Sequence, residues 1–302
     1  MPEYYHPSGK FSPAALIFIP LVTSVVASIL GIAYAYLTWY NPIVYIGIVF
    51  PLAYSYGVYF FSSWALDITP VRNNLLAFVL FFFGGLVGYV FHALVWLNLF
   101  IHQTDQVFQI GSDSRAFGFV VSTVNWKVLV SEALNLEYSI NYLLMVIDRG
   151  VWTLLGHEVM GLPYRLIWLG EFLIFTVTLA AFCRNEARKP FCETLGQYLQ
   201  KKTLPHLLRV PYELDGLKYK FEQGDYGYIM VADIEPNSRY NHIRIELYYL
   251  DEVDDAYLTV ILVTHANNKK EETKLLEYAG IPKIQADQLI RRYGEEIEYE
   301  VY

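Results

Sequence analysis

The chain has 302 residues, of which 55% are hydrophobic and only 17% charged, and its apolar residues gather into long blocks, as in a membrane protein. Its formal net charge of −8 and its pI near 5.4 argue against nucleic-acid binding, which requires a basic face. The only cysteines, Cys183 and Cys192, exclude a disulfide framework.

Four apolar blocks are each long enough to cross about 30 Å of hydrocarbon as a helix. We expect spans at about 13–39, 43–66, 75–100 and 162–183. The predicted fold is therefore a membrane all-α helical bundle of about four transmembrane helices, residues 1–185, followed by a small soluble domain.

Between the third and fourth blocks, residues 101–161 mix charges with short apolar runs, so we expect an extramembrane insert. Apolar residues recur at helical spacing from Leu136 to Leu155 and predict an amphipathic helix on the membrane surface or against the spans. A fifth span there is the alternative. His102, His157 and Glu158 share the insert but lack ligand spacing, so no metal site is predicted.

Basic residues crowd behind the fourth block and place the C-terminus in the cytoplasm by the positive-inside rule. Four crossings then put the N-terminus with Lys10 inside, the 67–74 link with Arg72 inside, and the insert outside. A fifth span would separate the termini. Both termini are therefore expected on the cytoplasmic side of the membrane.

The tail, residues 186–302, predicts a cytoplasmic α+β domain with an antiparallel sheet of about four strands. Its second helix is expected at 283–293, after Pro282, and the stretch 269–278 favours a first helix, with the return strand of a hairpin as the alternative. Alternating residues predict the strands, with turns at 224–225 and 251–255; the strands lie at about 217–221, 226–234, 243–249 and 257–263.

Glu171 is the sharpest functional candidate, because an ionised carboxylate inside a span is costly unless paired or hydrated. The predicted partner is His92 on the third span, through a hydrogen bond that lets the pair share a proton. Such a pair serves as structural glue between helices, as a site of proton or ion traffic, or as a carboxylate that reaches the lipid interface.

Gly84, Gly85 and Gly88 on the third span predict close approach of another helix, either within the chain or between sister chains. The acidic turn at 251–255 lacks the spacing of a calcium loop and is expected to be solvated. No motif of a known enzyme class occurs, so we predict neither an enzymatic activity nor a cofactor.

The chain resembles a group of uncharacterised bacterial multispanning membrane proteins with a C-terminal soluble domain. The resemblance is carried by residues 4–13, 71–73, 167–172 and 189–193. It implies a similar topology in a bacterial inner membrane, but no function. Some members carry paired cysteines that suggest a zinc ribbon, whereas here Leu195 stands where Cys192 would need a partner, and the 251–255 turn has no cysteine. The resemblance therefore implies that this chain lacks the metal site.

The leading functional prediction is a non-enzymatic anchor, scaffold or regulatory protein whose tail binds an unknown cytoplasmic protein or packs on sister chains as a homo-oligomer. The lipid bilayer is the other expected partner. The alternative is an oligomeric transporter or channel subunit that uses the intramembrane pair of Glu171 and His92.

Overall fold

The computed structural model describes residues 3–39, 49–101, 104–110, 117–149, 152–154, 157–212, 214–235, 237–266 and 269–294. In the strand hairpins of the insert, and at residues 215 and 266, it describes the backbone alone. The chain divides into two compact units, residues 9–188 and residues 189–302 together with 1–8. We call them the membrane unit and the soluble unit, after the locations that the sequence predicts.

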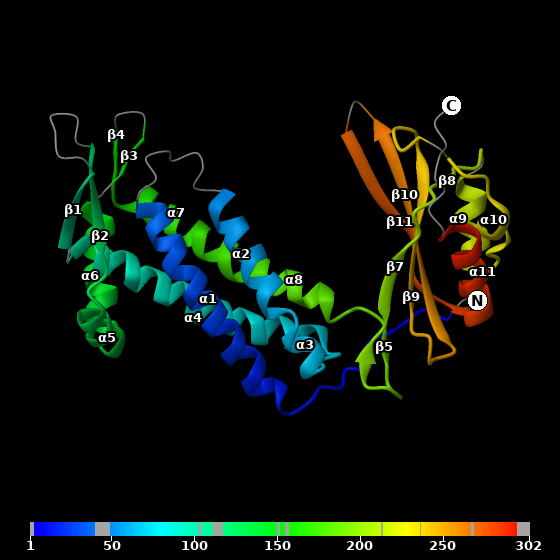
Figure 1. The fold of residues 1–302 in the computed structure, drawn as a ribbon, viewed down its shortest axis with the longest axis horizontal. Helices are drawn as coiled ribbons and strands as arrows, with labels where there is room; N and C mark the ends of the chain where they lie inside the picture. Colours follow the sequence, from blue (N-terminus) through cyan, green and yellow to red (C-terminus); the bar gives the residue numbers. More distant parts are fainter. Residues whose placement is uncertain are drawn as a thin grey trace. The chain divides into compact units, whose positions relative to one another are not determined.

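The membrane unit contains three helices that are long and apolar enough to cross a membrane. They are α1 (Ala15–Trp39), α4 (Asn74–Ile101), and a helix of three parts, with α7 (Leu162–Leu173) continuing through the π-helical turn η2 (Ile174–Thr178) into α8 (Leu179–Glu186). These three helices lie where the sequence predicts spans, at about 13–39, 75–100 and 162–183. The helices are drawn side by side in Figure 1.

The predicted span at 43–66 appears only in part. Its described portion is α2 (Val49–Ser62), a helix of 14 residues, followed by the short α3 (Ala65–Ile68), while residues 43–48 lie outside the described part of the chain. A helix of 14 residues is about 21 Å long and does not cross the hydrocarbon alone. Four crossings therefore stay a prediction.

Backbone hydrogen bonds fix which helix ends lie together. The amide of Gly9 donates to the carbonyl of Arg72 at 3.2 Å, and the amide of Arg72 donates to Lys10 at 2.9 Å, so α1 and α4 begin at the same end and run parallel. The Tyr59 hydroxyl on α2 donates to Glu186 at the end of α8 at 2.8 Å. These ends form the side of the unit that we call the basic end.

The insert lies at the opposite end of α4 (Figure 1). It contains the hairpin of β1 (Thr104–Ile110) and β2 (Phe117–Thr123), the helices α5 (Trp126–Leu134) and α6 (Leu136–Arg149), and the hairpin of β3 (Trp152–Leu154) and β4 (His157–Val159). The predicted amphipathic helix is confirmed as α6, although it ends at Arg149 and not near residue 155. With 14 residues, α6 is too short for a fifth span.

The soluble unit is an antiparallel sheet in the order β11-β10-β9-β7, with β8 also paired to β9. Three helices pack on it and share a core with β8, β9, β10 and β11. The strands are β5 (Phe191–Cys192), β6 (Gln197–Tyr198), β7 (Gln200–Thr203), β8 (Leu208–Arg209), β9 (His242–Tyr249), β10 (Asp255–Ala266) and β11 (Lys269–Pro282), and the helices are α9 (Leu214–Glu222), α10 (Gly227–Val231) and α11 (Lys283–Tyr293).

Several predictions for the tail were wrong. The strands expected at 217–221 and 226–234 are the helices α9 and α10, and 224–225 is the turn between them. The helix favoured at 269–278 is part of β11, so the alternative, a return strand, is confirmed. The turn at 251–255 and the helix at 283–293 are confirmed.

The N-terminus also differs from the sequence-based domain boundary. Residues 1–8, assigned to the membrane part, belong to the soluble unit, because the amide of Tyr5 donates to the carbonyl of Tyr278 at 2.9 Å and the amide of Gly280 donates to Glu3 at 2.7 Å. The N-terminal segment thus covers part of the free edge of β11, where unpaired backbone groups would otherwise remain.

Candidate functional site

The candidate site is centred on the carboxylate of Glu171 on α7. The hydroxyl of Tyr34 on α1 donates to Glu171 Oε1 at 2.5 Å, and the Glu171 side chain is only 16% exposed. The carboxylate is therefore held by a partner from another span.

His92 on α4 lies beside the same oxygen but does not bond to it. Its Nε2 is 3.9 Å from Glu171 Oε1, which is longer than a hydrogen bond. The Tyr34 ring packs edge-on against the His92 ring at 4.6 Å between centroids. The structure thus brings the predicted pair together, whereas the predicted direct hydrogen bond is replaced by that of Tyr34.

Tyr34 was missed at the sequence level. A weak signal exists, because Thr23, Ala27 and Gly31 recur every four residues along the small-residue face of α1, and Tyr34 continues that face. All four are buried. The pairing of this face with α4, which the sequence does not reveal, decides that Tyr34 reaches Glu171.

Aromatic rings fill the space around the site. Phe175 stacks on Tyr54 at 3.9 Å and on His92 at 5.7 Å, and Tyr89 packs edge-on against Phe175 at 5.3 Å. The hydroxyls of these tyrosines bond to backbone: Tyr54 donates to the carbonyl of Ala27 and Tyr89 to that of Trp168. The site is consequently a packed cluster in which the hydroxyls of Tyr54 and Tyr89 have acceptors, whereas His92 Nδ1 is buried without a hydrogen-bond partner among the described residues.

The helix changes geometry three residues after Glu171, at the π-helical turn η2. A π turn interrupts the regular helical hydrogen bonds and leaves backbone carbonyls in need of partners. The Ser55 hydroxyl on α2 lies 3.1 Å from the carbonyl of Ile174 and 3.4 Å from that of Phe175. Its single proton is shared between these acceptors and the carbonyl of Pro51 on its own helix, at 2.8 Å. The distortion is thus supported by a buried hydroxyl from another helix.

The glycines predicted to allow close packing face other helices of the same chain. A methyl group on Gly84 would lie 2.5 Å from Thr23 Cβ, and one on Gly88 would overlap the Cβ of Ala27. One on Gly85 would lie 3.0 Å from Leu179 Cδ2 on α8. The glycine face of α4 is occupied within the chain, which is one of the two alternatives that the sequence left open.

No group of three or more His, Cys, Asp or Glu side chains that could hold a metal ion occurs among the described residues. Cys192 lies in an apolar cluster with Leu199, Tyr248 and Leu250, and its sulfur accepts a hydrogen bond from the amide of Leu195. His102 lies outside the described residues, and the side chains of His157 and Glu158 are not described.

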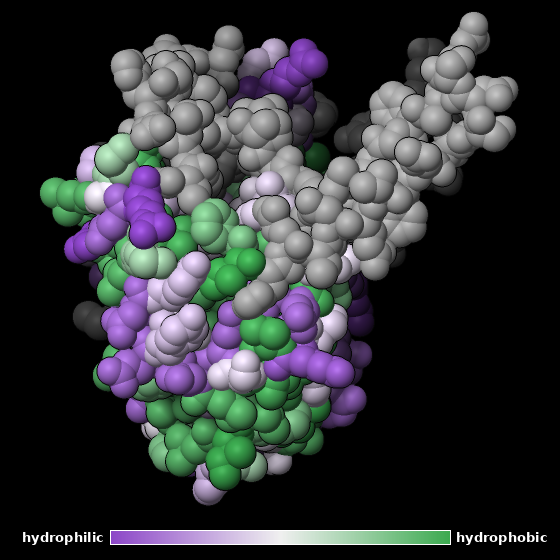
Figure 2. Space-filling model, turned by 90° about the vertical axis from the view of Figure 1, so that its left-hand side faces the viewer, coloured by the Kyte–Doolittle hydropathy of each residue, from purple (hydrophilic) through white to green (hydrophobic). Residues whose placement is uncertain are grey.

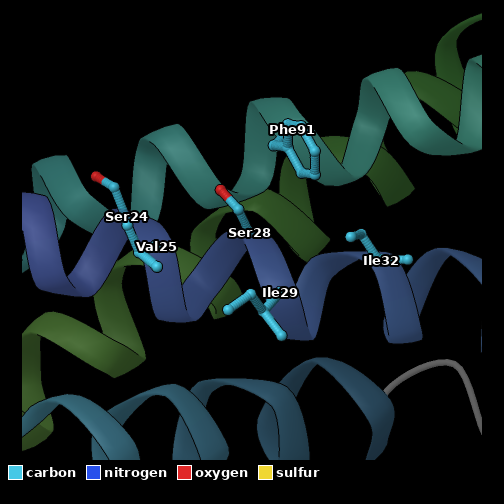
Figure 3. Close-up of a pocket in the computed structure, with 6 residues that line it drawn as sticks. All are labelled: Ser24, Val25, Ser28, Ile29, Ile32 and Phe91. Atoms are coloured by element: carbon cyan, nitrogen blue, oxygen red, sulfur yellow. The ribbon is translucent and has the colours of Figure 1, made fainter. Parts of the chain in front are cut away.

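A groove of about 290 Å³ lies along the exposed face of α1 and does not reach the site. Figure 3 shows its lining residues, five from α1 and one from α4: Ser24, Val25, Ser28, Ile29, Ile32 and Phe91. Val25 and Ile29 are more than half exposed. None of the lining residues contributes to the cluster around Glu171.

Comparisons with protein-family models, with curated proteins and with solved structures gave no match to this chain. The resemblance to a bacterial group therefore stays a prediction.

Proposed function

We propose that this chain is a non-enzymatic membrane anchor that holds its soluble unit at the cytoplasmic face of a bacterial inner membrane, where that unit binds a partner protein. The membrane unit supports this role through its packing. The contacts of Gly84 and Gly88 with Thr23 and Ala27 bring α1 and α4 together without space between them. Closely packed small residues are a stable way to join spans.

The observation that carries the proposal is the enclosure of the Glu171 carboxylate between the long helices. Its oxygen is engaged by Tyr34, and aromatic rings occupy its surroundings. The groove on α1 is lined by other residues and stays on the outside of the bundle. A route for a solute needs polar groups that line a hydrated path, so this arrangement favours helix-to-helix glue over transport.

The proposed topology has four crossings, with α2 and the residues before it forming the second. Residues 3–8 and residues 189–294 belong to one compact unit. This common membership supports an even number of crossings. Lys10, Arg72, Arg184 and Arg188 flank the span ends there, which favours a cytoplasmic position under the positive-inside rule.

The soluble unit supports partner binding because it has a hydrophobic core of its own, formed by its sheet and its three helices. A self-contained unit can present a surface without help from the spans. Packing on sister chains is the alternative to binding a cytoplasmic protein, and the test below separates the two.

Mild solubilisation and affinity purification of the full chain test the proposal. We expect a cytoplasmic protein to copurify in a fixed ratio and to be lost when residues 189–302 are replaced by an unrelated soluble domain. Copurification of lipids and sister chains alone would contradict partner binding.

One observation favours a second candidate function, proton-coupled transport by an oligomer: the π turn η2 begins three residues after Glu171, and such turns often occur at functional sites. Proton flux in liposomes separates the two proposals. Transport predicts that Glu171→Gln abolishes flux while Glu186→Gln, at the basic end of the same helix, does not. The anchor proposal predicts no flux above protein-free liposomes for either variant or for the wild type.

A further inference from the structure

The helices α5 and α6 of the insert each expose an apolar stripe. On α5, Trp126, Val130 and Leu134 follow one another at intervals of four residues and are 53%, 60% and 84% exposed. On α6, Leu136, Ile140 and Leu144 have the same spacing and are also exposed. Residues four apart lie on one face of a helix, so each helix carries a continuous stripe.

Apart from Ile147, which lies on the α6 stripe and is buried, the residues of these stripes are separate from those with which the helices pack. Leu129 on α5 and Val146 on α6 are buried in one hydrophobic cluster with the end of α4. A helix that is apolar on its packed face and on an exposed face does not suit a fully aqueous setting. Glu137, Asn141 and Asp148 are exposed on α6 and provide its polar face.

The side chain of Asn98 on α4 joins this hairpin to the end of α4 through two hydrogen bonds. The Asn98 amide donates to the buried carboxylate of Glu132 at 3.0 Å, and its oxygen accepts from the amide of Asn125 at 2.8 Å. Asn125 in turn caps α5, accepting a hydrogen bond from Val128. The exposed stripes are thus held in place by buried polar contacts.

The depth of the hairpin follows from the length of α4. Its 28 residues span about 42 Å, more than the roughly 30 Å of hydrocarbon, so its last turns lie at the membrane interface. The same cluster contains the partly buried rings of Trp39 and Trp168, and tryptophan concentrates at that depth. Figure 2, which faces the insert, shows hydrophobic residues over much of the lower described surface.

We propose that the α5–α6 hairpin is a lipid-binding platform whose two apolar stripes lie at the boundary between headgroups and acyl chains, on the insert side of the bilayer. The stripes continue the lipid-facing surface of the spans at the level of the tryptophans. Lys127, exposed beside Trp126, suits the phosphate of a lipid headgroup. This inference rests on insertion of the spans and not on the anchor function.

Spin labels on the full chain in phosphatidylcholine and phosphatidylglycerol nanodiscs test the platform. Labels would be placed at Val130→Cys, Leu134→Cys and Ile140→Cys, with Glu137→Cys and Asn141→Cys as matched controls on the polar face. The two native cysteines, Cys183 and Cys192, are buried, so the wild-type chain treated with the label gives the background signal. Collisions with oxygen report lipid, and collisions with a nickel chelate report water.

We expect the three stripe labels to favour oxygen over nickel severalfold more strongly than the two controls do. Equal nickel access at stripe and control labels would overturn the proposal, because the stripes would then face water. Exclusion of both reagents from the stripe would also overturn it, in favour of a protein partner. As a second measurement, brominated lipids should quench a larger fraction of the tryptophan fluorescence in the wild type than in Trp126→Phe. Equal fractional quenching would count against the platform.

Discussion

The close approach of Gly84 on α4 to Thr23 on α1 predicts a measurable steric penalty. In Gly84→Ala the new methyl group would lie 2.5 Å from Thr23 Cβ and 2.7 Å from Thr23 Cγ2. Carbon atoms pack best at about 3.5–4.0 Å, so α1 and α4 would have to separate by about 1 Å or shift. Overpacking of this kind costs about 1–3 kcal/mol.

Gly170→Ala is the matched control, because no atom lies within 4 Å of the new methyl group. Both substitutions gain the same helix propensity, about 1 kcal/mol. The difference between the two variants therefore isolates the steric cost, and we expect Gly84→Ala to be less stable than Gly170→Ala by about 1–3 kcal/mol.

The assay is reversible unfolding of the full chain in mixed micelles, with the two variants measured together. The double variant Thr23→Gly with Gly84→Ala should recover part of the loss, since the next contact of the methyl group is the carbonyl of Pro20 at 3.3 Å. Equal stability of Gly84→Ala and Gly170→Ala would refute the packing. A change in oligomeric state alone would instead indicate a contact between chains.

Three further predictions concern single contacts. Tyr34→Phe should destabilise the membrane unit by about 1–3 kcal/mol, because Glu171 loses its hydrogen bond; unfolding in mixed micelles measures this, and Glu171→Gln should make the effect of Tyr34→Phe smaller. Arg244 lowers the pKa of Glu272 to about 2, so the contribution of Glu272 to stability is complete above its unfolded pKa of about 4.3 and is lost as the pH falls to 2. Since Glu272 is 40% exposed, its effect on the free energy of unfolding is at most about 1 kcal/mol. The protection factors of the sheet amides, measured by hydrogen exchange of the full chain at pH 5 and pH 3, should change less with pH in Glu272→Gln than in the wild type. Deleting the first eight residues should speed exchange of the Gly280 amide, which donates to Glu3; unchanged exchange would contradict the edge pairing.

The sequence located the long apolar helices because their signal is local: each is a continuous apolar block without a nearby competitor. It failed where one pattern fits two structures. Leu217 and Phe221 suit both a strand of period two and a helix of spacing four, and the structure buries both while leaving Tyr219 between them 64% exposed.

The error at β11 has a different cause. The run at 269–274 is rich in Lys and Glu, which favour helices, yet it pairs with β10 along its length. Ion pairs such as Arg244 with Glu272 link the strands of this sheet. Tertiary pairing overrides a propensity of a few tenths of a kcal/mol per residue.

The sequence indicated only part of the candidate site, because it shows unusual residues but not which helices pair. Glu171 and His92 stand out in an apolar background, so composition alone singles them out. Tyr34 is one aromatic among many, and only the arrangement of α1 against α4 and α7 gives it the carboxylate. Which side chains meet between spans depends on helix pairing, which one sequence does not specify.

Photo-crosslinking in living cells tests the central claim, a soluble unit anchored for a partner, most directly. A photoreactive residue would replace Tyr219 or Tyr240 on the soluble unit, both of which are exposed, and Ile17 on α1 would serve as the lipid-facing control. The anchor account predicts a protein adduct from the soluble unit that sediments with the membrane, and no protein adduct from Ile17. Adducts to sister chains alone, or no protein adduct from the soluble unit, would contradict it.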